Sequence, residues 1–69
     1  GIFNLQFNDN IVGEKSVNIF DLTGRLVYNT VLNNEKDCLI DISNKDLGTY
    51  VLKISVNETQ YIKRITNIK

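Results

Sequence analysis

The fold of this chain is decided by residues 16–28, which read Ser16-Val17-Asn18-Ile19-Phe20-Asp21-Leu22-Thr23-Gly24-Arg25-Leu26-Val27-Tyr28. This stretch predicts a strand that ends at Leu22, a turn, and a second strand from Leu26 to Leu32. Thr23-Gly24 supplies the reversal, because glycine tolerates the positive φ that such hairpin loops require. Apolar residues switch parity within the first strand, which indicates that it carries a bulge or is covered on both faces. In either case we expect a central strand.

Outward from this hairpin, polar turn clusters separate short segments rich in Val, Ile, Leu, Phe and Tyr, and no segment shows helical periodicity. The further strands that we expect are Phe3–Phe7, Cys38–Ile42, Thr49–Val56 and Thr59–Ile68, with Asn57-Glu58 as a tight reversal. This pattern predicts an all-β fold, a small antiparallel immunoglobulin-like β-sandwich of six or seven strands. The residues expected to form its core are Phe3, Phe7, Val17, Ile19, Leu26, Leu39, Tyr50, Leu52, Ile54 and Ile65.

Length and charge narrow the possible roles. A chain of 69 residues predicts a single domain over residues 1–69, and a chain of this size buries only about 60% of its unfolded surface. Eight Lys and Arg offset eight Asp and Glu, so net charge gives no reason to expect a nucleic acid partner. The longest apolar run is three residues, which is too short to cross a bilayer, and the amino end lacks an export signal pattern. If the protein is exported, we expect that signal elsewhere.

The residue types argue against catalysis. The chain contains no His, so the usual nucleophilic triads cannot be assembled, and its three serines have no evident base. Asp21 and Asp41 could form a carboxylate pair, but a sandwich this small leaves little room for a cleft. We therefore expect that the protein is not an enzyme.

Metal and thiol chemistry are likewise not expected. Two oxygen-rich groups could offer ligands to calcium, but neither has the glycine placement of the twelve-residue calcium loop. These groups are Asn33, Asn34, Glu35 and Asp37, and Asp41, Asn44 and Asp46. The single Cys38 lies in a strand pattern, where a lone cysteine behaves as a small apolar residue. We predict no cofactor and no metal site.

Five short motifs follow one another in a characteristic order. They are the alternating strand Phe3–Phe7, then Asp21-Leu22-Thr23-Gly24-Arg25-Leu26-Val27, Asp41-Ile42-Ser43, Gly48-Thr49-Tyr50 with Val51-Leu52-Lys53, and Lys63-Arg64-Ile65. In this order and spacing, the chain resembles the carboxy-terminal sorting domain of proteins exported by the type IX secretion system of certain Gram-negative bacteria. The resemblance covers nearly all of the chain. Members of that family usually begin with an Asn-Pro segment, and this chain has no proline, so we expect it to start a few residues late.

The resemblance implies a domain that serves as a sorting signal for a cargo domain upstream in the same chain. Such a domain is in the periplasm in transit, is recognised by the outer-membrane translocon, and is typically removed by a sortase-like protease. Its cargo then lies at the cell surface or is secreted. The signature positions are Asp21, Gly24, Arg25, Gly48, Tyr50, Lys63, Arg64 and Ile65. Residues 59–69 are the expected contact, because an exposed last strand can add to a sheet edge of a receptor.

Most signature residues also have a purely structural interpretation, which for Lys63 and Arg64 is a solvated face of the sheet. Gly24 and Gly48 would relieve backbone strain in turns, and Tyr50 would be a core ring whose hydroxyl is tied to a loop carbonyl. Arg25 would bridge to Asp21 or Asp41. Lys63 and Arg64 are adjacent in a strand, so they point to opposite faces and cannot form one anion pocket without a bulge.

A different class of function competes with the sorting signal. The same sandwich would suit an immunoglobulin-like adhesion or accessory domain of a surface protein, which would contact carbohydrate or a partner chain. Carbohydrate binding usually requires exposed aromatic rings, and Tyr28 and Tyr61 are the candidates. An unpaired edge strand could also support an edge-strand dimer.

Overall fold

The computed structural model describes residues 1–7, 13–33 and 35–68, and over these ranges the chain forms six β-strands and no helix. The strands are β1 (Ile2–Gln6), β2 (Lys15–Phe20), β3 (Leu26–Leu32), β4 (Asp37–Asp41), β5 (Gly48–Val56) and β6 (Thr59–Asn67). The expected boundaries therefore hold to within two residues at each end where a strand was outlined from the sequence. Among the described residues, nothing helical is long or apolar enough to span a membrane.

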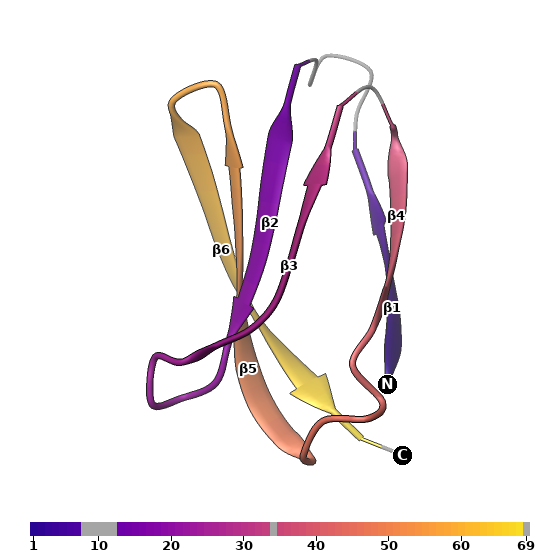
Figure 1. Ribbon diagram of the computed structural model, residues 1–69, viewed down its shortest axis with the longest axis vertical. Coiled ribbons are helices and arrows are strands. Elements are labelled where there is room, and N and C mark those ends of the chain that lie inside the picture. Colours follow the sequence, from indigo (N-terminus) through magenta and orange to yellow (C-terminus); the bar gives the residue numbers. More distant parts are fainter. Residues whose placement is uncertain (8–12, 34, 69) are drawn as a thin grey trace.

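The strands form two antiparallel sheets. One sheet has the order β3-β2-β5-β6, and the other pairs β1 with β4. In Figure 1 the β1–β4 pair lies at the right, and β6 runs from the upper left across β5 to the C-terminus at the bottom. The predicted all-β antiparallel sandwich is confirmed, while its immunoglobulin-like topology stays a prediction.

β2 is a central strand, as its pattern indicated. It pairs with β3 on one side and with β5 on the other. Its register against β3 shifts between Ile19 and Phe20, where Val27 of β3 is the extra residue, and its register against β5 has no shift. The bulge therefore lies in β3, and the alternative of a bulge in β2 was wrong. Phe20 continues the regular alternation of β2, so it lies half-buried on the face opposite Val17 and Ile19, and this explains the change of parity.

The core lies between the two sheets and draws on both. Its buried apolar residues are Val17, Ile19, Leu32, Cys38, Ile40, Ile42, Tyr50, Leu52 and Val56. Val17, Ile19, Tyr50 and Leu52 are therefore buried as expected. Phe3, Phe7, Ile54 and Ile65 are partly buried and pack against the cluster. The free thiol of Cys38 is buried among these apolar residues, and this burial raises its pKa.

Two expected core residues face solvent instead. Leu39 is 67% exposed, because Cys38 and Ile40 occupy the inward positions of β4 and leave Leu39 on the opposite face. Leu26 is 48% exposed. It pairs with Phe20 beyond the bulge, on the outer side of the larger sheet.

Lys15 is a buried cation at the start of β2. Its side chain is almost fully buried, and its Nζ donates to the carbonyl oxygens of Gly13 at 3.2 Å and Asn33 at 3.4 Å. The same ammonium lies 5.2 Å from the centre of the Phe7 ring. A buried charge needs such compensation, so Lys15 ties β1 and the loop after β3 to the start of β2.

Asn67 closes the opposite end of the sandwich. Its side chain is fully buried at the end of β6. Its Nδ2 donates to the carbonyl oxygens of Ile42 at 2.9 Å, Asp46 at 3.0 Å and Lys45 at 3.2 Å, and its Oδ1 accepts from the nitrogen of Gly1. The amide of Ile42 in turn donates to the carbonyl of Gly1 at 3.0 Å. One amide side chain thus joins β6, the loop after β4 and the residue before β1, which places both ends of the chain together in Figure 1.

A two-residue turn joins β5 to β6. Asn57 and Glu58 both have positive φ, 54° and 122°, as the reversal predicted from the sequence requires. Asparagine adopts such angles at little cost, but at the second position glycine is the residue of choice. Glu58 therefore holds local backbone strain.

We predict that Asn67→Ala destabilises the domain by about 2–4 kcal/mol, because several carbonyl oxygens and the Gly1 nitrogen lose a buried partner at once. Thr66→Ala, on the neighbouring exposed residue, should cost less than about 1 kcal/mol. Urea denaturation followed by circular dichroism measures both. Equal losses for the two variants would show that Asn67 is an ordinary strand residue.

We predict that Glu58→Gly raises the free energy of unfolding by about 0.5–1 kcal/mol, since it relieves the positive φ in the hairpin turn. Glu58→Ala is the matched control, because it removes the carboxylate but keeps the Cβ that causes the strain. Thermal denaturation should show a higher melting temperature for the glycine variant only. A gain of the same size in the alanine variant would assign the effect to the charge.

Candidate functional site

The Asp21 turn between β2 and β3 is held by one carboxylate. Oδ1 of Asp21 accepts from the amide of Thr23 at 3.0 Å, the hydroxyl of Thr23 at 2.6 Å and the amide of Arg25 at 3.0 Å. Nε of Arg25 lies 3.3 Å from Oδ2. Of the two predicted bridges for Arg25, the one to Asp21 is therefore present. The guanidinium is still largely exposed, so the ion pair adds little to stability.

Gly24 completes this turn for a conformational reason. Its φ is 90°, and a Cβ there would meet no atom within 4 Å. Space would thus allow a side chain, but the backbone conformation strongly favours glycine. The structural interpretation of Gly24 is confirmed.

A second carboxylate organises the loop after β4 in the same way. Oδ1 of Asp41 accepts from the amide of Ser43 at 2.9 Å and from the hydroxyl of Ser43. In both turns an Asp is followed two residues later by a hydroxyl residue, an arrangement that replaces backbone pairing with side-chain hydrogen bonds. The hydrogen bonds from Thr23 and Arg25 lower the pKa of Asp21, and those from Ser43 lower the pKa of Asp41.

Tyr50 anchors the loop that leads into β5. The ring is buried, and its hydroxyl donates to the carbonyl of Asp46 at 2.6 Å, as predicted. Gly48 precedes it with a φ of 137°, and a Cβ there would again meet nothing within 4 Å. Ile65 pairs with Tyr50 across β5 and β6 and is partly buried against the core. The three residues therefore support the fold.

The Asp21 turn and the loop before β5 meet at one end of the sandwich. Between them lies an open hollow of about 310 Å³. Its lining includes the signature residues Asp21, Arg25, Gly48 and Tyr50. The structure thus brings together two motifs that lie more than twenty residues apart in sequence. Of the remaining signature residues, Gly24 lies in the Asp21 turn, and Lys63, Arg64 and Ile65 lie on β6.

Lys63 and Arg64 differ from the other signature residues. They sit in the middle of β6, where Lys63 pairs with Leu52 and Arg64 pairs with Val51. Both are exposed. Because they are consecutive in a strand, they point to opposite faces of the sheet, as expected. In the part of the chain that the structure describes, neither makes an ion pair or a side-chain hydrogen bond.

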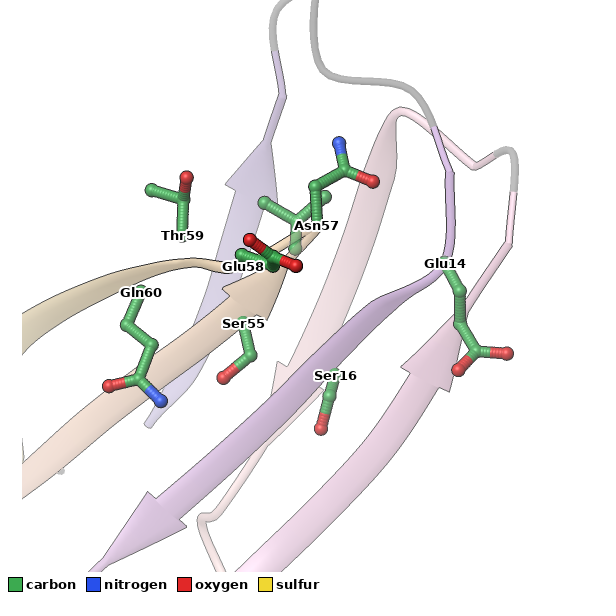
Figure 2. Close-up of a pocket in the computed structure, with 8 residues that line it drawn as sticks. Glu14, Ser16, Ser55, Asn57, Glu58, Thr59 and Gln60 are labelled. Carbon is green, nitrogen blue, oxygen red and sulfur yellow. The ribbon is translucent and has the colours of Figure 1, made fainter.

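A second hollow of about 310 Å³ lies beside the turn between β5 and β6, and Figure 2 shows its side chains. Ser16 and Ser55 line it from neighbouring strands, with Glu14 and Glu58 placed apart from each other. The serine hydroxyls have no histidine to act as base, since the sequence contains none. This hollow therefore holds no serine–histidine pair.

Metal binding finds no geometric support among the described residues. No three side chains of His, Cys, Asp or Glu gather there into a group that could hold an ion. Of the two oxygen-rich groups, Asp41 is engaged with Ser43, and Asn34 lies outside the described residues.

Two residues with a clear structural role escaped the sequence reasoning. Lys15 and Asn67 are buried polar residues that tie separate segments together. The available signal for Asn67 was its parity, because it lies two residues after Ile65 on the inward side of β6. A polar residue at an inward position needs partners.

We predict that acid weakens the domain through Asp21 and Asp41. A carboxyl whose pKa is lower in the folded state stabilises fully above its ordinary pKa, which is 3.8, and this contribution is lost as pH falls through the folded pKa. Stability should therefore fall as the pH drops below about 4. Denaturation at a series of pH values measures the slope, and the double variant Asp21→Asn with Asp41→Asn should flatten it.

Thr23→Val tests whether the hydrogen bond from the Thr23 hydroxyl lowers the pKa of Asp21. It removes the hydroxyl that donates to Asp21, so the pKa of Asp21 should rise toward its ordinary value in an NMR titration. An unchanged pKa in this variant, or an unchanged slope in the double variant, would contradict the role of these turns.

Comparison with known proteins places this arrangement in a family. No curated protein and no solved structure matches the chain. A family model described as the secretion system C-terminal sorting domain matches residues 1–69, which is the whole chain. Such domains are type IX secretion signals, which direct export across the outer membrane to the cell surface or the medium and act with an upstream cargo domain. The motif order read from the sequence agrees with that match, and the chain belongs to the family of secretion system C-terminal sorting domains.

Proposed function

We propose that this domain is the part of a longer exported protein that the outer-membrane translocon of the type IX system recognises. It folds in the periplasm, its cargo then passes to the cell surface or the medium, and a sortase-like protease removes the domain. The domain performs no chemistry of its own and is a substrate of the export machinery.

One observation carries this proposal: the signature residues divide into two groups with different roles. Six of the eight have a role inside the domain, in a turn or in the core. Lys63 and Arg64 have no such role among the described residues and lie exposed on β6. Residues of a sorting signal that do not support the fold are available to be read by a receptor.

The location of β6 suits a contact with another protein. β6 is an edge strand of the larger sheet, and β5 is its one neighbour among the described strands. Main-chain N–H and C=O groups on a free edge can pair with an added strand. The contact segment expected from the sequence, residues 59–69, contains this strand.

A reporter assay tests the proposed function. A reporter that carries its own export signal into the periplasm is fused to the amino end of residues 1–69 and expressed in a strain with a working type IX system. We expect the reporter at the cell surface or in the medium, measured by protease accessibility and by fractionation. The same reporter without the domain should stay in the periplasm.

An isogenic strain that lacks the translocon is the matched control, and there the fusion should also stay in the periplasm. An adhesion or accessory domain, the competing function, would leave the reporter in the periplasm in both strains. That result would overturn the proposal.

A further inference from the structure

The free edge of β6 is long and open. All nine of its residues pair with β5 on one side, from Gly48 opposite Asn67 to Val56 opposite Thr59. No strand lies on its other side in the part of the chain that the structure describes. Most of its residues are exposed, and Asn67 is buried at its end. The strand therefore presents a row of main-chain groups to an incoming segment, with its own position fixed at one end.

Three cations lie along the middle of this edge. Lys63 and Arg64 occupy opposite faces of β6, and Lys53 on β5 shares the face of Arg64. The one carboxylate between residues 48 and 68 belongs to Glu58, in the turn. The ion pair found among the described residues joins Arg25 to Asp21, so these three cations, which we call the basic edge, are not neutralised within the described domain.

A second copy of the domain fits this edge poorly. Lys63 is the central residue of β6, since the strand runs from Thr59 to Asn67. Two copies of β6 paired antiparallel over their full length would therefore place Lys63 opposite Lys63. Like charges directly opposite each other in a sheet are destabilising, so the basic edge disfavours this dimer.

An apolar hollow beside the same strand adds a second requirement, besides charge, for a segment that would pair with β6. It measures about 220 Å³ and is lined by Gln6, Phe7, Ile54 and Tyr61. Tyr61 lies on β6 two residues before Lys63, so the two side chains share a face. A strand that paired with β6 would present one side chain opposite Tyr61, next to this hollow, and an apolar side chain suits it.

We propose that the free edge of β6 binds an extended segment of a partner protein that carries a carboxylate on each face, opposite Lys63 and Arg64, and an apolar side chain opposite Tyr61. This inference rests on the proposed function, because the partner would be the component of the export machinery that reads the signal. Charge complementarity selects the acidic segment, and the main-chain groups of β6 supply the pairing.

The probe is a capped peptide with the sequence Thr-Thr-Val-Glu-Glu-Thr-Leu-Thr-Thr, which has the length of β6 and places its acidic pair opposite the basic pair in an antiparallel register. The control peptide has Lys in place of both Glu residues. NMR titration of the isotope-labelled domain at low salt measures affinity and the position of binding. We expect chemical shift changes along β6 with the Glu peptide, and binding at least about fivefold tighter than that of the Lys peptide.

Single charge reversals locate the effect. Lys63→Glu and Arg64→Glu should each lower the affinity of the domain for the Glu peptide by about fivefold or more. Lys36→Glu makes the same change in net charge in the loop before β4 and should leave the affinity nearly unchanged. Absence of shifts along β6, equal affinity for the two peptides, or an equal loss in Lys36→Glu would overturn the inference. Binding to anionic phospholipid vesicles with neither peptide bound would also overturn it, because it would assign the basic edge to a membrane.

The reporter assay separates this inference from the function on which it rests. Both proposals are supported if the unaltered domain delivers the reporter to the surface or the medium, while a folded Lys63→Glu or Arg64→Glu variant leaves it in the periplasm. If both variants deliver the reporter as well as the unaltered domain does, the inference about the basic edge is wrong and the proposed sorting function stands. If the unaltered domain is not delivered, the sorting function fails, and the peptide titration still decides whether the edge selects an acidic strand.

Discussion

The buried amide of Asn67 is the constraint on which the rest of this small sandwich depends. A two-stranded sheet covers a four-stranded one, and a chain of 69 residues has little surplus stability. Asn67 fixes β6 to the loop after β4 and to Gly1, so it links segments that lie at opposite ends of the sequence. Its nitrogen donates to the carbonyls of Ile42, Lys45 and Asp46. Two of these carbonyls also accept from a second donor, Ile42 from the amide of Lys45 and Asp46 from the hydroxyl of Tyr50, so the amide belongs to a network that holds this loop.

The sequence motifs of the family fall into two groups in this structure, those that support the fold and those that lie exposed on β6. Asp21 holds a turn, Gly24 and Gly48 permit positive φ, and Tyr50 fixes the loop before β5. A motif that is needed for folding places a constraint on sequence without touching a receptor. The fold that these residues build positions β6 as an exposed edge, and in the function that we propose Lys63 and Arg64 on that edge meet a partner.

Much of the fold could be predicted because alternation and turn chemistry are local properties. The central position of β2, the reversal at residues 57–58 and the hydroxyl bond of Tyr50 all followed from residue types and spacing. Leu39 was wrongly expected in the core. Alternation with a period of two divides the residues of a strand between two faces, but it does not show which face is buried. Lys15 and Asn67 could not be assigned partners, since those partners come from segments distant in sequence and depend on how the two sheets pack. The hollow between the Asp21 turn and the loop before β5 was missed for the same reason.

The net charge of the chain is zero, but its charges are unevenly distributed. The cations on β6 affect two properties of an edge strand, its pairing with copies of itself and its pairing with another protein. Cations on a free edge discourage pairing between copies of the same strand, which protects a soluble domain from aggregation. The same cations leave the edge attractive to a strand of opposite charge. In the function that we propose, the signal must avoid its own copies and still be captured by a receptor. Lys63 and Arg64 meet both demands in this proposal, because opposite faces of β6 carry them. In this proposal the open edge is selective through charge, while the Asn67 contacts keep it in place.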